Sequence, residues 1–215
     1  ITARVYDRAG NVHGETYRYE LDATPPTSTA SSPAYATSSP FDVNWTAEDA
    51  QSGVYSASLW YRKELTGIWA HYETLQGDSG AFHFVPAQGN GLYQFAILAA
   101  DNVGNVEAGP LVTETQTIYD TDVPQSRVDW APAFRAVSPI TVTWIATPSL
   151  APLSEVALWY RLDGGAWINT SIVSTGPYTS GTFAFDPPAD GTYGLATVAS
   201  DAVAKSEAEP YGSAS

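Results

Sequence analysis

The amino-acid sequence predicts an all-β chain built from tandem Greek-key β-sandwiches in an extended array. The first observation behind this prediction is a repeat, because Trp45 recurs as Trp144 and Trp60-Tyr61-Arg62 recurs as Trp159-Tyr160-Arg161, each 99 positions later. A unit of this length matches a sandwich domain of about 100 residues and exceeds the roughly 20 to 50 residues of a solenoid repeat. The second observation is that no stretch shows a convincing 3.6-residue apolar period, whereas short alternating runs lie between Pro, Gly, Ser and Asp.

Each copy contains the same succession of strand signals. Residues 41–45 and 140–144 alternate apolar and polar side chains, which is typical of a half-buried strand. Further strands are expected from the two Trp-Tyr-Arg runs, and Asp163-Gly164-Gly165 is a strong hairpin signal because Gly accepts positive φ. The residues predicted to centre the two cores are Trp45, Tyr61 and Phe95, and Trp144, Tyr160 and Leu195.

Two equivalent Asp- and Pro-containing stretches, residues 22–26 and 120–124, divide the chain. Proline stiffens an extended junction, so we expect seven-strand sandwich domains at residues 23–121 and 122–215. Residues 1–22 resemble the end of a preceding copy. The second copy has no counterpart of residues 111–119 and is therefore expected to lack its final strand.

Composition limits the partners. The formal net charge is −14, which disfavours nucleic acids and anionic membrane surfaces. There is no cysteine, so neither disulfides nor thiolate metal ligands contribute, as in many secreted bacterial β-repeat proteins. No apolar run approaches the roughly 20 residues of a membrane span, and membrane insertion is not expected.

Three motifs carry a family resemblance. They are Tyr-Arg-Leu-Asp-Gly-Gly-Ala-Trp at 160–167, Asp-Gly-Thr-Tyr at 190–193 and Asp-Asn-Val-Gly-Asn-Val-Glu at 101–107. Together they resemble the bacterial immunoglobulin-like repeats of large surface and secreted proteins, which are similar in architecture to fibronectin type III modules. The resemblance covers nearly the whole chain. It implies tandem immunoglobulin-like sandwiches, an extracellular or cell-surface location, and an adhesive, structural or spacer role, with no catalytic residues to transfer.

A tetrapeptide of chymotrypsin-like proteases, Gly-Asp-Ser-Gly, stands at residues 77–80. Such an enzyme needs a histidine base and a buried aspartate delivered to the serine. His13, His71 and His83 stand in no recognisable partner motif, so Ser79 is expected to lie in an ordinary turn. No enzymatic activity is predicted.

Calcium is the one cofactor that the sequence suggests. A hard cation could be shared by oxygens at the end of a sandwich. The candidate ligands are Asp101, Asn105, Glu107, Asp120 and Asp122. The competing interpretation is a structural turn, since Asp and Asn beside Gly form hydrogen bonds to the local backbone.

Exposed-face aromatic residues form a second candidate site. Trp60 and Arg62 share one face of their strand, and Trp159 and Arg161 share the equivalent face. These side chains could contact surface glycans or a neighbouring subunit. Alternatively, each Trp lies across its own sheet and covers Arg methylenes.

The N-terminal segment Glu15–Leu21 could act as a donor strand. Its residues alternate between two faces and comprise Glu15, Thr16, Tyr17, Arg18, Tyr19, Glu20 and Leu21. A sandwich without its final strand exposes unpaired backbone groups, so this segment could complete the last sandwich of another copy in a head-to-tail homopolymer. The alternative is a covalent repeat array in which residues 1–22 finish the previous domain.

The sequence therefore predicts a structural or adhesive extracellular repeat protein, a subunit or segment of a bacterial surface stalk or filament. Two alternatives remain. One is a carbohydrate-binding accessory region of a secreted hydrolase, with Trp69 and Trp167 joining Trp60 and Trp159 as platforms. The other is an inert spacer.

Overall fold

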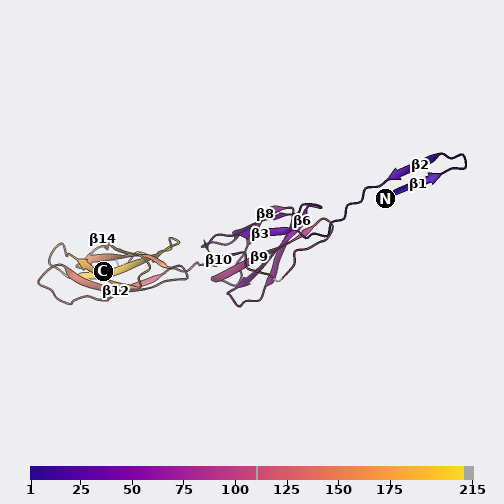
Figure 1. Cartoon of the computed structure of the whole chain (residues 1–215). Helices are drawn as coiled ribbons and strands as arrows, with labels where there is room; N and C mark the ends of the chain where they lie inside the picture. Colours follow the sequence, from indigo (N-terminus) through magenta and orange to yellow (C-terminus); the bar gives the residue numbers. More distant parts are fainter. Residues whose placement is uncertain (110, 211–215) are drawn as a thin grey trace.

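A computed structural model describes residues 1–109 and 111–210 as an all-β chain. Three bodies follow one another along an extended molecule: a small hairpin, a first sandwich and a second sandwich (Figure 1). In this described part, no helix is long and apolar enough to cross a membrane. The predicted fold class, an all-β array of immunoglobulin-like sandwiches, is confirmed.

The N-terminal hairpin consists of β1 (Thr2–Tyr6) and β2 (Val12–Thr16), which pair antiparallel from Thr2 opposite Thr16 to Tyr6 opposite Val12. Every residue of both strands is exposed to solvent. A connector, residues 17–21, leads from this hairpin to the first sandwich (Figure 1).

The first sandwich contains eight strands in two sheets. One sheet has the order β3-β5-β8, and the other has the order β4-β10-β9-β6-β7. The strands are β3 (Thr27–Ser31), β4 (Tyr35–Ala36), β5 (Phe41–Glu48), β6 (Val54–Lys63), β7 (Ala70–Gln76), β8 (Ser79–Phe84), β9 (Gly91–Asp101) and β10 (Thr115–Tyr119). The strand beyond the predicted seven is β4, which pairs parallel with β10.

Alternation along β5 builds the core of this sandwich. Phe41, Val43, Trp45 and Ala47 are buried, and the residues between them are exposed. From the facing sheet Phe95 is buried, while Tyr61 packs against the cluster with partial exposure. The predicted core centre is confirmed.

The second sandwich contains six strands in two three-stranded sheets, β11-β12-β15 and β14-β13-β16. The strands are β11 (Gln125–Trp130), β12 (Ile140–Thr147), β13 (Leu153–Leu162), β14 (Ile168–Thr175), β15 (Ser180–Phe185) and β16 (Tyr193–Asp201). Asp163 and Gly164 take positive φ (49° and 74°) between β13 and β14, as the hairpin signal predicts. Residues 211–215, the end of the predicted second domain, lie outside the described residues.

The core of the second sandwich repeats that of the first, but it is less completely covered. Trp144 and Val142 are fully buried on β12. The other two predicted core residues, Tyr160 and Leu195, pack against this cluster with partial exposure. Among the described residues no strand follows β16. In the first sandwich β10 pairs with β9, whereas the equivalent edge of β16 has no paired strand among those residues.

Candidate functional site at the domain junctions

One aspartate joins the two sandwiches. Asp120 directly follows β10, and its backbone N–H donates to Ala36 O of the first sandwich at 3.0 Å. Its carboxylate Oδ2 accepts the backbone N–H of Ala151, in the loop between β12 and β13 of the second sandwich, at 2.7 Å. Asp120 and Ala151 are both fully buried. A single residue therefore bonds to both domains.

The adjoining linker residues add further contacts to the same junction. Thr121 donates from its backbone N–H and its hydroxyl to Asn90 Oδ1 of the first sandwich, at 3.2 and 3.0 Å. Asp122 donates its backbone N–H to Asp120 Oδ1 at 3.1 Å. The first residues after β10 are thus held in place rather than left as free coil.

Asp22 repeats this arrangement at the start of the first sandwich. Its Oδ2 accepts the backbone N–H of Ser52 at 3.0 Å, and its Oδ1 accepts that of Thr24 at 2.9 Å. Ser52 stands 99 positions before Ala151, so the accepting aspartate and the donating backbone N–H both recur in the second copy. A hydrogen bond from the Ser52 side chain, followed by that from the Thr24 backbone N–H, lowers the pKa of the Asp22 carboxyl.

The turn after β9 explains the acidic motif of the repeat. Asp101 Oδ1 accepts the backbone N–H groups of Val103 and Asn105 at 2.9 and 2.8 Å, and Oδ2 accepts the Asn105 amide at 2.6 Å. Asp7 and Asp201 accept the two equivalent backbone N–H groups of their own turns. Burial raises the pKa of Asp101, but hydrogen bonds led by that from Asn105 outweigh it, and the pKa lies below the usual value.

Glu107 ties the two sheets of the first sandwich together. Its carboxylate accepts the backbone N–H and hydroxyl of Ser28 on β3, at 2.6 and 2.5 Å, and the backbone N–H of Ala99 on β9, at 2.7 Å. Glu207 makes the same three contacts in the second sandwich, with Ser126 and Ala199. This residue stabilises the fold.

The structure does not assemble the predicted five-residue calcium set. Asp120 follows β10, whose last residue pairs with Gly91, whereas Asp101 ends β9 ten residues further along that strand. At about 3.3 Å per residue, the two carboxylates lie at opposite ends of the sandwich, and Asp122 lies with Asp120. The prediction placed the Asp101 turn beside the junction that contains Asp120. It was wrong because β10 runs antiparallel to β9 and returns the chain to the other end of the sandwich before Asp120.

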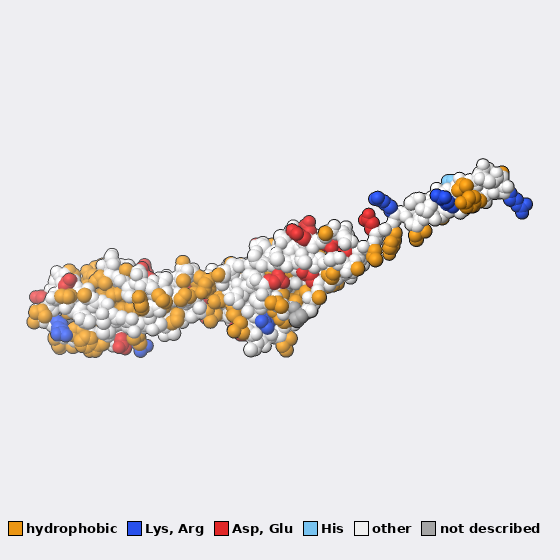
Figure 2. All heavy atoms as spheres, in the orientation of Figure 1, with side chains coloured by type: hydrophobic (Ala, Val, Ile, Leu, Met, Phe, Trp, Pro, Cys, Tyr) orange, Lys and Arg blue, Asp and Glu red, His pale blue; other side chains and the backbone are white. Residues whose placement is uncertain are grey.

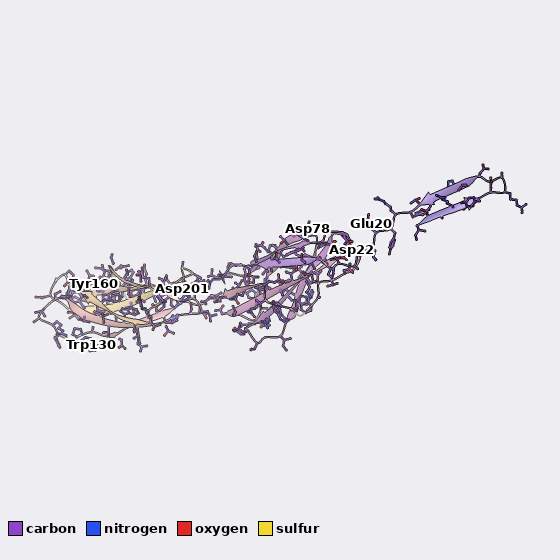
Figure 3. All side chains as sticks on the ribbon, viewed as in Figure 1. Glu20, Asp22, Asp78, Trp130, Tyr160 and Asp201 are labelled. Carbon is purple, nitrogen blue, oxygen red and sulfur yellow. The ribbon has the colours of Figure 1, made fainter. Side chains whose placement is uncertain are left out.

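Asp101 instead meets acidic residues at the N-terminal end of its sandwich. Carboxylate oxygens of Asp22, Asp49 and Asp101 lie within 4.8 Å of one another. Figure 3 places Asp22 at the end of the first sandwich that faces the hairpin, and Asp201 at the end of the second sandwich that faces the first. The repeat does not mark Asp49 as a candidate ligand, because the equivalent position in the second copy is Pro148.

The tryptophan and arginine residues form repeated stacks on the outer faces. The Arg62 guanidinium lies 4.8 Å from the centre of the Trp69 ring, and that of Arg161 lies 5.0 Å from the centre of Trp167. Trp60 instead meets His71 edge-on, with ring centroids 5.4 Å apart. Trp159 is half-buried, and its indole nitrogen is buried with no hydrogen-bond partner among the described residues. Arginine of the same domain therefore covers one face of Trp69 and of Trp167.

Ser79 does not lie in the expected turn, because it is the first residue of β8 and pairs with Thr46 of β5. Its hydroxyl donates to Asp78 Oδ1 at 3.1 Å. The two histidines of this sandwich bond elsewhere, His71 to Thr74 at 3.0 Å and His83 to Asp42 at 2.7 Å. No hydrogen bond of the described residues joins Ser79 to a histidine, so no protease dyad is formed there.

Comparison with known proteins gives a likeness of fold. No protein-family model matches the chain. No curated protein is detectably similar to it. Among solved structures, the chain is similar to domains A168-A170 from titin, with 13% identity over 94% of this chain and 69% of that one and a TM-score of 0.44. It is also similar to the chicken CNTN1 FN1-FN3 domains, with 11% identity over 94% of this chain and 71% of that one and a TM-score of 0.39.

Proposed function

We propose that this chain is a structural segment of a bacterial extracellular stalk or filament, in which sandwiches are joined by aspartate-pinned junctions. The observation that carries the proposal is the Asp120 contact set, because one buried residue bonds to the sandwich before it and to the sandwich after it. Domains linked in this way keep a fixed direction relative to each other. A fixed direction is what a stalk needs to hold another domain away from a surface.

Repetition supports the same role. Asp22 makes the equivalent side-chain contact at the preceding junction, so the same joint is available wherever the repeat recurs. A joint that recurs gives an array a regular shape. The absence of cysteine and the net charge of −14 suit a soluble extracellular segment of bacterial origin.

Glycan binding by the aromatic residues is the less favoured function. Sugar platforms need an open aromatic face, and Arg62 and Arg161 already lie over Trp69 and Trp167. The stacks recur in both sandwiches, as expected for a feature that stabilises the sheet. Titration with soluble glycans, followed by tryptophan fluorescence, separates the two functions, since the structural role predicts no saturable change.

Small-angle X-ray scattering of the 215-residue chain tests the proposal. The wild-type protein should scatter as an elongated particle with little bending between the sandwiches. Asp120→Ala should bend more, because it removes the acceptor of the Ala151 N–H. Asp122→Ala is the matched control, since it removes a carboxylate from the same linker but not that hydrogen bond. Equal scattering by all three proteins would refute the pinned junction.

A further inference from the structure

Tyr72 on β7 closes one edge of the first sandwich, where β7 ends one sheet and β8 ends the other. Its ring packs against Tyr61 and Phe84, with ring centroids 6.1 and 4.8 Å away. Its hydroxyl donates to His83 O at 2.8 Å and accepts the Val85 backbone N–H at 3.1 Å. One phenol group therefore contacts two aromatic rings and bonds to the backbone at the end of β8.

The second sandwich repeats the aromatic walls of this site. The strand registers place Tyr160 where Tyr61 stands and Phe185 where Phe84 stands. The ring centroids of Tyr160 and Phe185 lie 5.2 Å apart, against 5.0 Å for the first pair. The same aromatic pair is therefore present at the equivalent edge, which β14 and β15 form.

The backbone partners of the hydroxyl recur as well. Ala184 stands at the place of His83, and Asp186 stands at the place of Val85. Backbone groups of an antiparallel edge strand face its partner at alternate residues only, so the equivalent groups, Ala184 O and Asp186 N–H, face away from β12. An acceptor and a donor for one hydroxyl are thus both in place.

The tyrosine itself does not recur. Thr170 takes the place of Tyr72, because each follows the residue that pairs with the tryptophan of the repeated Trp-Tyr-Arg run. The Thr170 hydroxyl donates to Leu158 O at 2.7 Å and accepts the Ile172 N–H at 3.0 Å, so it bonds within the β13–β14 pair. β14 therefore supplies neither the ring nor the hydroxyl that β7 supplies.

A cavity of about 210 Å³ lies where the Tyr72 ring lies in the first sandwich. Its lining includes the side chains of Tyr160, Ile172 and Phe185 and reaches Asp186. A cavity of about 150 Å³ can hold benzene, so this one is large enough for a phenol. It lies at the edge that β14 and β15 form, and both strands are described along their whole length, so the cavity depends on neither end of the chain.

We propose that this cavity binds a phenol group, the chemistry of a tyrosine side chain. The ring packs against Tyr160 and Phe185. The hydroxyl donates to Ala184 O and accepts the Asp186 N–H, which is the arrangement that Tyr72 shows in the first sandwich. This binding site goes beyond the proposed structural role and does not depend on the pinned junction.

The ligand of this site is neutral. A phenol has an ordinary pKa of about 10, so at neutral pH it keeps the proton that it donates to Ala184 O. Phosphotyrosine has no phenol proton and carries about two negative charges, which the Asp186 carboxylate and the net charge of −14 repel. Figure 2 shows few charged side chains among the hydrophobic and uncharged ones on the visible face of the second sandwich.

Titration with p-cresol, the tyrosine side chain as a free molecule, tests the site by NMR of the isotope-labelled 215-residue chain. The Asp186 amide signal should shift saturably, because its N–H gains an acceptor. p-Xylene has the same shape without the hydroxyl and should bind at least about tenfold more weakly, since two hydrogen bonds are lost. Equal binding of the two compounds would overturn the proposal. So would the lack of a saturable shift up to the solubility limit of p-cresol.

N-acetyltyrosinamide distinguishes the two sources of a phenol. If the site takes a tyrosine of a polypeptide, this compound should bind at least as tightly as p-cresol. If the site takes a free phenol, only p-cresol should shift the Asp186 amide. Either result supports phenol binding and identifies the source.

Two variants test the position of the ligand. Thr170→Tyr should fill the cavity and abolish the response of the Asp186 amide to p-cresol. Val173→Tyr is the matched control, since it adds a tyrosine at a position of the same strand that is 44% exposed, and it should leave the response unchanged. Tyr72→Thr should create the same site in the first sandwich, so that the Val85 amide now responds to p-cresol.

A response that persists in Thr170→Tyr, or one that Val173→Tyr removes equally, would overturn the assignment to this cavity. If Thr170→Tyr does not fold, an unchanged Val85 amide in Tyr72→Thr would overturn it instead. None of these results affects the scattering of Asp120→Ala, so failure of phenol binding and failure of the pinned junction are separate outcomes.

Discussion

Replacing Asp120 by alanine should destabilise the second sandwich while leaving the first nearly unchanged. The substitution removes the acceptor of the Ala151 N–H, a 2.7 Å hydrogen bond between two fully buried residues. A buried donor left without an acceptor costs about 1–3 kcal/mol. We expect the free energy of unfolding of the second sandwich to fall by that amount. Asp120→Asn should cost less, because its amide oxygen still accepts.

Urea unfolding followed through resolved NMR signals of each sandwich measures the two domains separately. Hydrogen exchange of the Ala151 amide reports the broken contact directly and should accelerate in Asp120→Ala. Asp122→Ala is again the control. The reasoning is refuted if Asp120→Ala costs less than about 0.5 kcal/mol, the range of an ordinary surface substitution, or if Ala151 exchange is unchanged.

Four further predictions follow from the described contacts. Gly181→Ala should lower the free energy of unfolding of the second sandwich by about 1–3 kcal/mol, because the added Cβ would lie 2.7 Å from the Trp144 ring. Gly80→Ala should lower that of the first sandwich by less, because its Cβ would lie 3.2 Å from Trp45. A larger loss for Gly80→Ala than for Gly181→Ala in urea unfolding would contradict this. Trp144→Ala should cost about 3–5 kcal/mol in the same assay, and a loss below about 1 kcal/mol would show that the ring does not fill the core. The lowered pKa of Asp22 means that its contribution to stability is complete above the pKa of an unfolded Asp and is lost as pH falls through the lower folded value. The protection of the Ser52 amide, measured relative to its intrinsic exchange rate at each pH, should therefore fall only in acid, and Asp22→Asn should remove that dependence. Calcium titration should give no saturable heat below about 1 mM, since the Asp101 oxygens already accept hydrogen bonds; heat that disappears in Asp49→Asn would contradict this.

The sequence predicts the strands in which apolar and polar residues alternate. The apolar positions of β5 and β12 recur every second residue, so both strands and their buried tryptophans follow from the pattern. β4 has no such pattern, because Tyr35 and Ala36 form a strand only where β10 pairs with them. That pairing joins residues more than 80 positions apart, and no local signal contains it.

The junction was harder to predict for a topological reason. Asp101 and Asp120 are close in sequence, but β10 separates them by the length of the sandwich. Asp101 lies instead beside Asp22, which stands far upstream. The recurrence of Asp22 as Asp120 marks the junction in the sequence, but it does not identify the backbone amides of Ser52 and Ala151 as the partners.

The most direct test of the pinned junction is a distance distribution between the two sandwiches. Spin labels on cysteines introduced at Glu73 of the first sandwich and Thr182 of the second, both exposed, allow measurement by pulsed electron paramagnetic resonance. If Asp120 fixes the direction of the second sandwich, the wild-type background should give one narrow distribution, and Asp120→Ala should broaden it while Asp122→Ala does not. A broad distribution in the wild-type background, or one that Asp120→Ala leaves unchanged, would contradict the account.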